Sequence, residues 1–263
     1  MKKTIFGRLI TLCLIAALLC SLLTGCGGAE EKGNTTWTLE NGVLTISGTG
    51  PMEEYSEAGS PWYSDAAEIH TAVIEEGVTR IGKYAFYGCQ NLTSITIADS
   101  VRSINFRAFY NCDSLINVTI PDSVESIEGQ AFAECDSFTS ITIPNSVRSL
   151  GRNAFYDCDN LEEVRLSRGL TRLERDTFYH CVSLTSISIP EGVTEIDSMV
   201  FSDCYGLEHV SIPSSVKRIG EMAFYFCNNL SSAYYNGSSS QWAQVKVENS
   251  NDALLAVLQF SPQ

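Results

Sequence analysis

Apolar residues return along this chain with a fixed period of 23 residues. The unit is clearest in residues 92–114, whose apolar positions are Leu92, Ile95, Ile97, Val101, Ile104, Ala108, Phe109 and Cys112. Seven copies without insertion fill residues 69–229, and two ladders keep phase throughout: Phe86, Phe109, Phe132, Phe155, Phe178, Phe201 and Phe224, with Cys89, Cys112, Cys135, Cys158, Cys181, Cys204 and Cys227. A unit this short cannot bury its own apolar face, so its copies must stack. The pattern therefore predicts a repeat solenoid.

The spacing within one copy predicts the path of the chain around each coil. Alternation over residues 94–97 predicts a short, half-buried strand. Val101 and Ile104 form a second inward pair, which is compatible with a second short strand. Adjacent Ala108 and Phe109, followed by Cys112, favour one helical turn. Proline ends the first strand in four copies, because it removes a ladder donor; these are Pro121, Pro144, Pro190 and Pro213. The predicted fold class is a β-rich solenoid with one short helical turn per coil.

The two ends of the repeat region depart from the period and predict caps, which a solenoid needs because its terminal coils expose apolar ends. At the first end, two runs with strand character flank Asn41-Gly42, so residues 37–68 are expected to open with a β-hairpin and a type I′ turn. At the other end, residues 230–263 are expected to form a cap with a short helix around Trp242 and a closing strand near Leu258.

The start of the chain has the composition of an export signal. Three positive charges precede an apolar run over residues 9–23, and the run ends in Leu23-Thr24-Gly25-Cys26. This ending resembles the lipobox of bacterial lipoproteins. The resemblance implies cleavage before Cys26 and a diacylglyceryl thioether on its sulfur, and two acyl chains suffice for stable membrane attachment. An ordinary cleaved signal with a chance cysteine is the alternative. The expected organisation is a signal peptide at 1–25, lipidated Cys26 with a flexible tether at 26–36, caps at 37–68 and 230–263, and repeats at 69–229.

The repeat itself resembles the BspA-type bacterial leucine-rich repeat. The shared pattern is Leu-x-x-Ile-x-Ile-Pro, then Val-x-x-Ile, then Ala-Phe-x-x-Cys, and its apolar spine is present in all seven copies. Thr177 and Val200 replace the alanine in two copies, and Glu75, Ala98 and Ser167 occupy the proline position in three. The resemblance implies a leucine-rich repeat fold and a protein exposed on the cell envelope or secreted. It also implies a role in adhesion, which some members of the family have.

Charge and cysteine usage narrow the choice of partners. The formal net charge of −14 would become −17 on loss of Lys2, Lys3 and Arg8 with the signal, which argues against nucleic acid and anionic membranes as partners. Attachment to a membrane is expected through the lipid anchor only. An odd number of ladder cysteines at equivalent positions favours seven free, buried thiols over disulfides, although neighbouring coils would be close enough for bridging. We expect no metal site, because a 22-residue gap between cysteines is not a ligand spacing.

Catalytic chemistry is not indicated. The three histidines, His70, His180 and His209, occupy different phases of the repeat, and no phosphate-binding loop appears. Buried ladder cysteines are unsuited to a Cys–His nucleophile pair. We therefore expect neither an enzyme nor a cofactor. A cysteine-dependent enzyme or redox protein is a remote alternative.

Three surface patterns are candidates for binding. A tyrosine follows the core phenylalanine in five copies; these are Tyr87, Tyr110, Tyr156, Tyr179 and Tyr225. Exposed tyrosines at these positions would suit protein or sugar recognition. The alternative is that they only cover the joints between coils. The outward strand positions are rich in Ser and Thr, and Arg165 and His209 interrupt that uniformity. Acidic residues surround the ladder cysteines, and basic residues precede the second inward position. The pattern predicts an acidic and a basic stripe at different edges of the coils.

The combined expectation is a lipid-anchored protein on the outside of a bacterial cell envelope that binds other proteins, in adhesion or in recognition of host or neighbouring cells. The alternatives are a glycan-binding module that uses the tyrosine stripe, and an envelope scaffold with no dedicated ligand. We expect a monomer. The acidic residues are expected to form a solvated face rather than a cation site.

Overall fold

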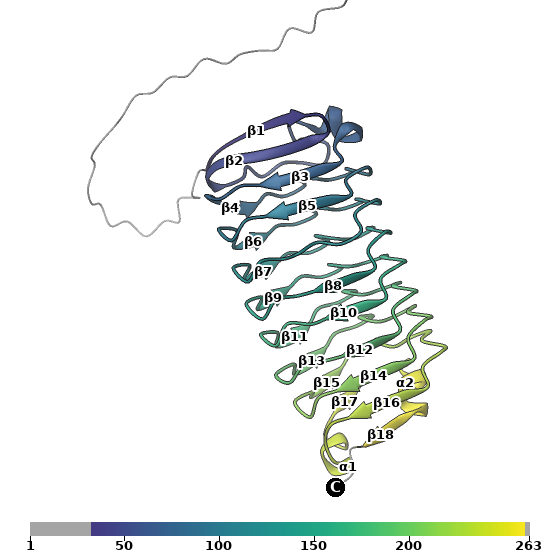
Figure 1. The fold of residues 1–263 in the computed structure, drawn as a ribbon. Helices are drawn as coiled ribbons and strands as arrows, with labels where there is room; N and C mark the ends of the chain where they lie inside the picture. Colours follow the sequence, from purple (N-terminus) through teal and green to yellow (C-terminus); the bar gives the residue numbers. More distant parts are fainter. Residues whose placement is uncertain (1–32, 261–263) are drawn as a thin grey trace, which may run out of the picture. The chain divides into compact units, whose positions relative to one another are not determined.

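A computed structural model describes residues 33–260, which belong to one compact unit. The predicted solenoid is confirmed: successive coils stack on one another, and parallel strands line two faces (Figure 1). Paired residues in neighbouring coils are one period apart, as with Val164 and Ile141 or Ile187 and Val210. The predicted signal peptide and Cys26 lie outside the described residues. Among the residues that are described, no helix is long and apolar enough to cross a membrane.

The strands form two columns, one on each face of the coils. The first column contains β1 (Asn34–Glu40), β2 (Val43–Pro51), β3 (Thr71–Ile74), β5 (Ser94–Ile97), β8 (Ser140–Thr142), β10 (Glu163–Arg165), β12 (Ser186–Ser188), β14 (His209–Ile212), β16 (Ser232–Tyr235) and β18 (Leu258–Phe260). The second column contains β4 (Val78–Ile81), β6 (Ser103–Ile104), β7 (Ser126–Ile127), β9 (Ser149–Leu150), β11 (Arg172–Leu173), β13 (Glu195–Ile196), β15 (Arg218–Ile219) and β17 (Lys246–Val247). The second inward pair of each repeat is thus a short strand. Strand β2 belongs to both columns, because its two ends pair with β3 and β4.

The helical turn predicted in each coil is replaced by consecutive tight turns. Bonds from Ala108 N–H to the Asn105 carbonyl (3.1 Å) and from Tyr110 N–H to the Arg107 carbonyl (3.3 Å) span three residues each. Arg107 and Asn111 have positive φ angles of 53° and 57°, which a right-handed helix does not contain. The intervening amide of Phe109 donates to the next coil instead. Apolar spacing alone could not distinguish this arrangement from a helical turn, because both bury the same side chains.

The core is a column of phenylalanine rings with a column of thiols beside it. The seven ladder phenylalanines are fully buried, and the centroids of neighbouring rings are 5.0–5.7 Å apart. All seven ladder cysteines are buried and free, as expected. Six of them donate a hydrogen bond to the carbonyl of the phenylalanine in the preceding coil, each at 3.1 Å. Burial raises the pKa of Cys89 and Cys227 to about 12 and that of the other five well above its ordinary value.

Both caps contain the elements that the sequence predicts. Strands β1 and β2 form the hairpin, and positive φ angles at Asn41 and Gly42 agree with a type I′ turn. Strand β1 begins at Asn34, so residues 34–36 are strand rather than tether. A short 3-10 helix, η1 (Tyr63–Glu68), follows the hairpin. At the other end, α1 (Ser239–Trp242) and β18 match the prediction, whereas α2 (Asp252–Ala256) was not foreseen.

The first strand column is interrupted in one coil. Residues 117–120 form no strand, and none of their backbone groups has a hydrogen bond to a neighbouring coil in the described structure. The next coil carries Phe138 at a position where five of the other copies have Leu and the first has Ile69, and the Phe138 ring packs edge-on against Phe132 at 5.7 Å. We attribute the interruption to this larger side chain, because it needs more space between the two coils than Leu does.

This interruption predicts locally fast hydrogen exchange. The amide of Ile120 has no partner, whereas the equivalent amides of Ile143 and Ile189 donate to the next coil at 2.8 and 2.9 Å. We expect Ile120 to exchange at least about tenfold faster than both in native-state exchange measured by NMR. Replacement of Phe138 by Leu should slow its exchange. Equal protection at all three positions would contradict the interruption.

Candidate functional site

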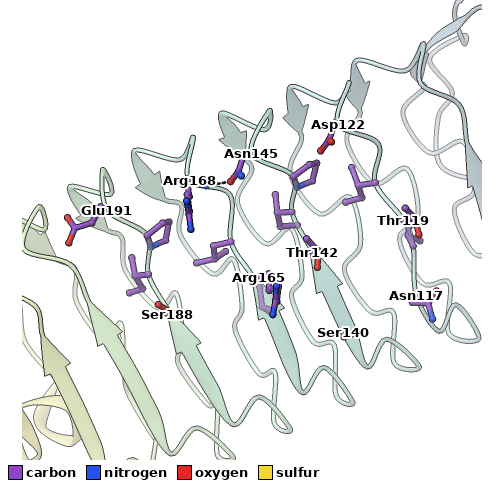
Figure 2. A pocket seen from close by; sticks show the side chains of 18 of the residues that line it. Asn117, Thr119, Asp122, Ser140, Thr142, Asn145, Arg165, Arg168, Ser188 and Glu191 are labelled. Carbon is purple, nitrogen blue, oxygen red and sulfur yellow. Dashed lines mark hydrogen bonds between the residues drawn. The ribbon is translucent and has the colours of Figure 1, made fainter.

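A groove lies over strands β8, β10 and β12 and the loops that follow them. Its volume is about 1210 Å³. The strands contribute Ser140, Thr142, Arg165 and Ser188, and the interrupted coil contributes Asn117 and Thr119 (Figure 2). The loops contribute Asp122, Asn145, Arg168 and Glu191 (Figure 2), and Pro144 and Pro190 also line the groove. Outward strand positions and the loops that follow them recur from copy to copy, so the repeat places these side chains in rows.

Two arginines from one coil mark the middle of the groove, between Asp122 and Glu191 (Figure 2). Arg165, whose side chain is 75% exposed, lies 3.4 Å from the Glu163 carboxylate. The Arg168 side chain forms no ion pair in the described part of the chain. Two exposed guanidinium groups can bind a carboxylate, sulfate or phosphate with directed hydrogen bonds.

A substitution in the repeat explains the position of Arg168. The preceding residue, Ser167, takes the place of the proline found in four other copies and is fully buried. Its hydroxyl donates to the Val147 carbonyl at 2.7 Å and accepts from Gly169 N–H at 3.0 Å. The Arg168 N–H donates to Asn145 Oδ1 at 2.9 Å. These bonds anchor the loop backbone and leave the guanidinium over the groove.

His209 is on the same strand column as Arg165 but does not line the groove. Strand β12 separates β14, which carries His209, from β10. The Nδ1 atom of His209 lies 2.8 Å from Ser232 Oγ. Of the two residues that interrupt the Ser and Thr rows, the structure therefore places only Arg165 in the groove.

The tyrosine stripe divides into separate groups. Tyr87 and Tyr110 stack at 5.3 Å, and Tyr156 and Tyr179 stack at 5.1 Å. Ala133 and Ser202 occupy the equivalent positions between these pairs and before Tyr225, so the stripe is discontinuous. None of the five tyrosines lines the groove.

The tyrosine hydroxyls are engaged within the protein in several cases. Tyr87 and Tyr110 donate to Glu57 and Glu134. The bond to Glu57, together with burial, raises the pKa of Tyr87 to about 12. Four of the five rings are half-buried, and only Tyr225 is exposed, packed against Phe226. This arrangement fits rings that cover joints between coils better than a continuous binding stripe.

Basic residues of the last coils pair with acids of the second strand column rather than forming a stripe of their own. Asp197 lies 2.6 Å from Arg172 Nη2 and 3.6 Å from Arg218 Nη1. Arg218 also contacts Glu195 and lies 3.2 Å from Glu248 in the C-terminal cap. Burial alone would raise the pKa of Asp197, but the Ser198 N–H and the two guanidinium groups hold it below its usual range. The network therefore connects three coils to the cap.

We expect Asp197→Asn to lower the free energy of unfolding by about 2 kcal/mol at pH 7, because the Asp197 side chain is only 12% exposed and accepts bonds from charged donors. The lowered pKa means that the carboxylate stabilises the fold above its unfolded pKa. This contribution is lost as pH falls through the folded-state pKa. The difference between wild type and variant, measured by urea unfolding, should therefore be complete at pH 6 and decline below about pH 4. A pH-independent difference would contradict this assignment.

One group of potential metal ligands is present among the described residues, although the sequence predicted none. Asp157, Asp159 and His180 have potential ligand atoms within 4.8 Å of one another. The repeat spacing in the sequence indicates part of this group: Asp157 and His180 are 23 residues apart and thus occupy the same position in neighbouring coils. The phases of the three histidines relative to one another do not reveal this relation, because it joins a histidine to an aspartate. The turn with Asp157 and Asp159 precedes β10 and the turn with His180 precedes β12, whereas the arginine loop follows β10, so the cluster and the groove lie at different ends of these strands.

Comparison with known proteins agrees with the geometry. A family model described as the BspA type leucine rich repeat region matches residues 57–164 and 125–251. No curated protein matches the chain. A leucine-rich repeat protein from Bacteroides ovatus is similar in structure, with 24% identity and a TM-score of 0.63; the match covers 83% of this chain and 66% of that one. For a leucine-rich repeat protein of T. pallidum the identity is 23% and the TM-score 0.60, with coverage of 81% and 95%.

At these identities, the structural likeness concerns the fold. The family match spans well over half of the chain and coincides with the repeated spine and both strand columns. This chain therefore belongs to the BspA-type leucine-rich repeat family, whose members are typically surface-associated.

Proposed function

We propose that this protein is anchored through Cys26 to the outside of a bacterial cell envelope and binds an extended segment of another protein in the groove. The observation that carries the proposal is the groove itself, in which rows of Ser, Thr and Asn side chains surround Arg165 and Arg168. Hydroxyl and amide groups donate and accept hydrogen bonds, and so match the backbone of an extended polypeptide. The typical surface association of the family supports the location.

The two arginines in the middle of the groove favour a partner segment that carries carboxylates. The chain has a formal net charge of −14, yet two arginines occupy the middle of the groove. Buried or clustered arginines are frequent sources of binding energy in protein interfaces. The groove contains no aromatic side chain on which a sugar ring would stack. These features favour protein over glycan as the ligand.

A binding screen tests this function. The purified protein is applied to arrays of extracellular-matrix proteins, mucins and glycans at two salt concentrations. We expect a saturable protein ligand whose affinity falls at least tenfold with Arg165→Ala and Arg168→Ala combined. The triple variant Tyr110→Ala, Tyr156→Ala and Tyr179→Ala is the matched control and should retain binding.

The other outcomes distinguish the alternatives. Loss of binding in the tyrosine variant alone, or a glycan as the only ligand, would favour the glycan-binding function. The absence of any saturable ligand would favour an envelope scaffold. For the anchor, Cys26→Ser is expected to move the protein from the membrane fraction to the soluble fraction, and an unchanged membrane fraction would refute lipidation at this residue.

A further inference from the structure

A second site candidate lies in the neighbouring turns that precede strands β10 and β12. His180 Nδ1 is 2.5 Å from Asp157 Oδ1 and 3.4 Å from Asp159 Oδ1. The two aspartates flank Cys158 in one coil, and His180 belongs to the next coil. One imidazole nitrogen and two carboxylate oxygens, contributed by two coils, therefore lie within 4.8 Å of one another.

The backbone holds these side chains in place. Asp157 and His180 both have a φ angle of 58°, and their amides donate to carbonyls of the following coils: Asp157 to Tyr179 and His180 to Ser202, both at 2.9 Å. The imidazole packs beside the ring of Tyr179, with centroids 6.2 Å apart, and against the edge of Tyr205 at 6.0 Å. The position of the imidazole is thus determined by neighbours on two coils before any ligand binds.

Among the described residues, one ligand atom accepts no hydrogen bond, although His180 Nδ1 lies 3.4 Å from it. Asp159 Oδ1 is shielded from solvent and accepts no hydrogen bond in the described structure. A carboxylate oxygen in this state has lost its hydration without gaining a donor, which is unfavourable. The rest of the Asp159 carboxylate remains accessible, so a small cation can reach the cluster.

The surroundings carry negative charge that no basic residue neutralises. Asp136 and Asp113 occupy the position of Asp159 in the two preceding coils. Burial, followed by the charges of Asp159, Asp113 and Asp157, raises the pKa of Asp136. Among the described residues, no lysine or arginine forms an ion pair with Asp136, Asp157 or Asp159. A bound cation would relieve this repulsion.

We propose that Asp157, Asp159 and His180 form a binding site for a divalent transition-metal ion such as Zn²⁺. Mixed imidazole and carboxylate ligands suit Zn²⁺ and its neighbours, whereas Ca²⁺ takes oxygen ligands only. On binding, His180 Nδ1 donates its lone pair to the metal, and the ring proton resides on Nε2, so the imidazole stays neutral. The Asp157 and Asp159 oxygens complete three protein ligands, and water occupies the remaining positions. The site would join two coils.

The alternative is an ordinary hydrogen bond between His180 and Asp157, and metal titration separates the two. Untagged, purified protein is titrated with Zn²⁺ by calorimetry, and with Co²⁺ while its visible absorption is followed. We expect one equivalent of Zn²⁺ to bind in wild type and to be lost in His180→Ala and in Asp159→Asn. Affinity should fall more than about 100-fold, since loss of even an outer-shell partner costs 10- to 100-fold.

His209→Ala is the matched control, because His209 also lies beside a carboxylate, Glu208 at 3.8 Å, but lacks a second one. This variant should bind Zn²⁺ as wild type does, and a tenfold excess of Ca²⁺ should not displace the ion. Thermal unfolding without metal verifies that each variant is folded. A wild type that binds no Zn²⁺, or a folded His180→Ala variant that still binds the same equivalent, would overturn the proposal.

Discussion

Replacement of Phe155 by alanine is expected to lower the free energy of unfolding by about 3–5 kcal/mol. Its ring is fully buried and stacks between Phe132 and Phe178, at centroid distances of 5.5 and 5.6 Å. Truncation removes contacts on both sides and leaves a cavity that the neighbouring coils can fill only in part. In a solenoid, each coil is stabilised by its interfaces with its two neighbours, and this change weakens both. Urea unfolding followed by circular dichroism measures the loss.

Phe226→Ala is the matched control, because it removes the same side chain from a position that is 46% exposed. A change of no more than about 1 kcal/mol is expected there, as is usual for surface substitutions. Similar losses for the two variants would mean that the ring column does not dominate the stability of the repeats.

Trp62→Ala is expected to have a comparable effect, about 3–5 kcal/mol, through the N-terminal cap. The indole is buried at the end of the phenylalanine column, 6.2 Å from Phe86, and its Nε1–H donates to the Ala85 carbonyl at 2.7 Å. The rings of Tyr55 and Trp37 pack edge-on against it. Loss of the indole exposes the end of the column to water and leaves the Ala85 carbonyl without its donor.

The location of the damage distinguishes this variant from Phe155→Ala. Because a solenoid transmits contacts only between neighbours, Trp62→Ala should increase hydrogen exchange most in β3 and β5 and least in β12 and β14. Trp37→Ala provides a control, since this indole lies on the outer side of the same cluster and is partly exposed. Uniformly faster exchange along all coils would show that Trp62 does not act as a local cap.

Several features could be predicted because they depend on a short stretch of sequence or on the repeat pattern itself. Asn41-Gly42 specifies a type I′ turn through its own backbone preferences, and the hairpin has it. The in-phase phenylalanines and cysteines predicted buried columns, and both are buried throughout the seven copies. Around Ala108 the predicted helical turn is a pair of tight turns instead, because alternate amides there bond to the next coil, and that competition between partners does not appear in the spacing of apolar residues.

The candidate sites were less predictable because their residues meet across coils. Arg165 stood out in the sequence, but Arg168 joins it only through the loop that Ser167 anchors. The tyrosine pattern predicted a single stripe, but Ala133 and Ser202 interrupt it and leave two separate stacked pairs. His180 shares its repeat phase with no other histidine, but it lies one period after Asp157, and the fold places the two side chains together.

The sequence by itself determined the period, the strand register and the residues that face the core. Apolar burial supplies most of the driving force for folding, and a strict repeat leaves one way to bury the same face in every coil. Only the tertiary structure decided where the first strand column is interrupted near Phe138, which outward side chains line the groove, and how closely His180 approaches Asp159. These features depend on spacing between coils and on side-chain conformations at the surface, where burial imposes no single solution.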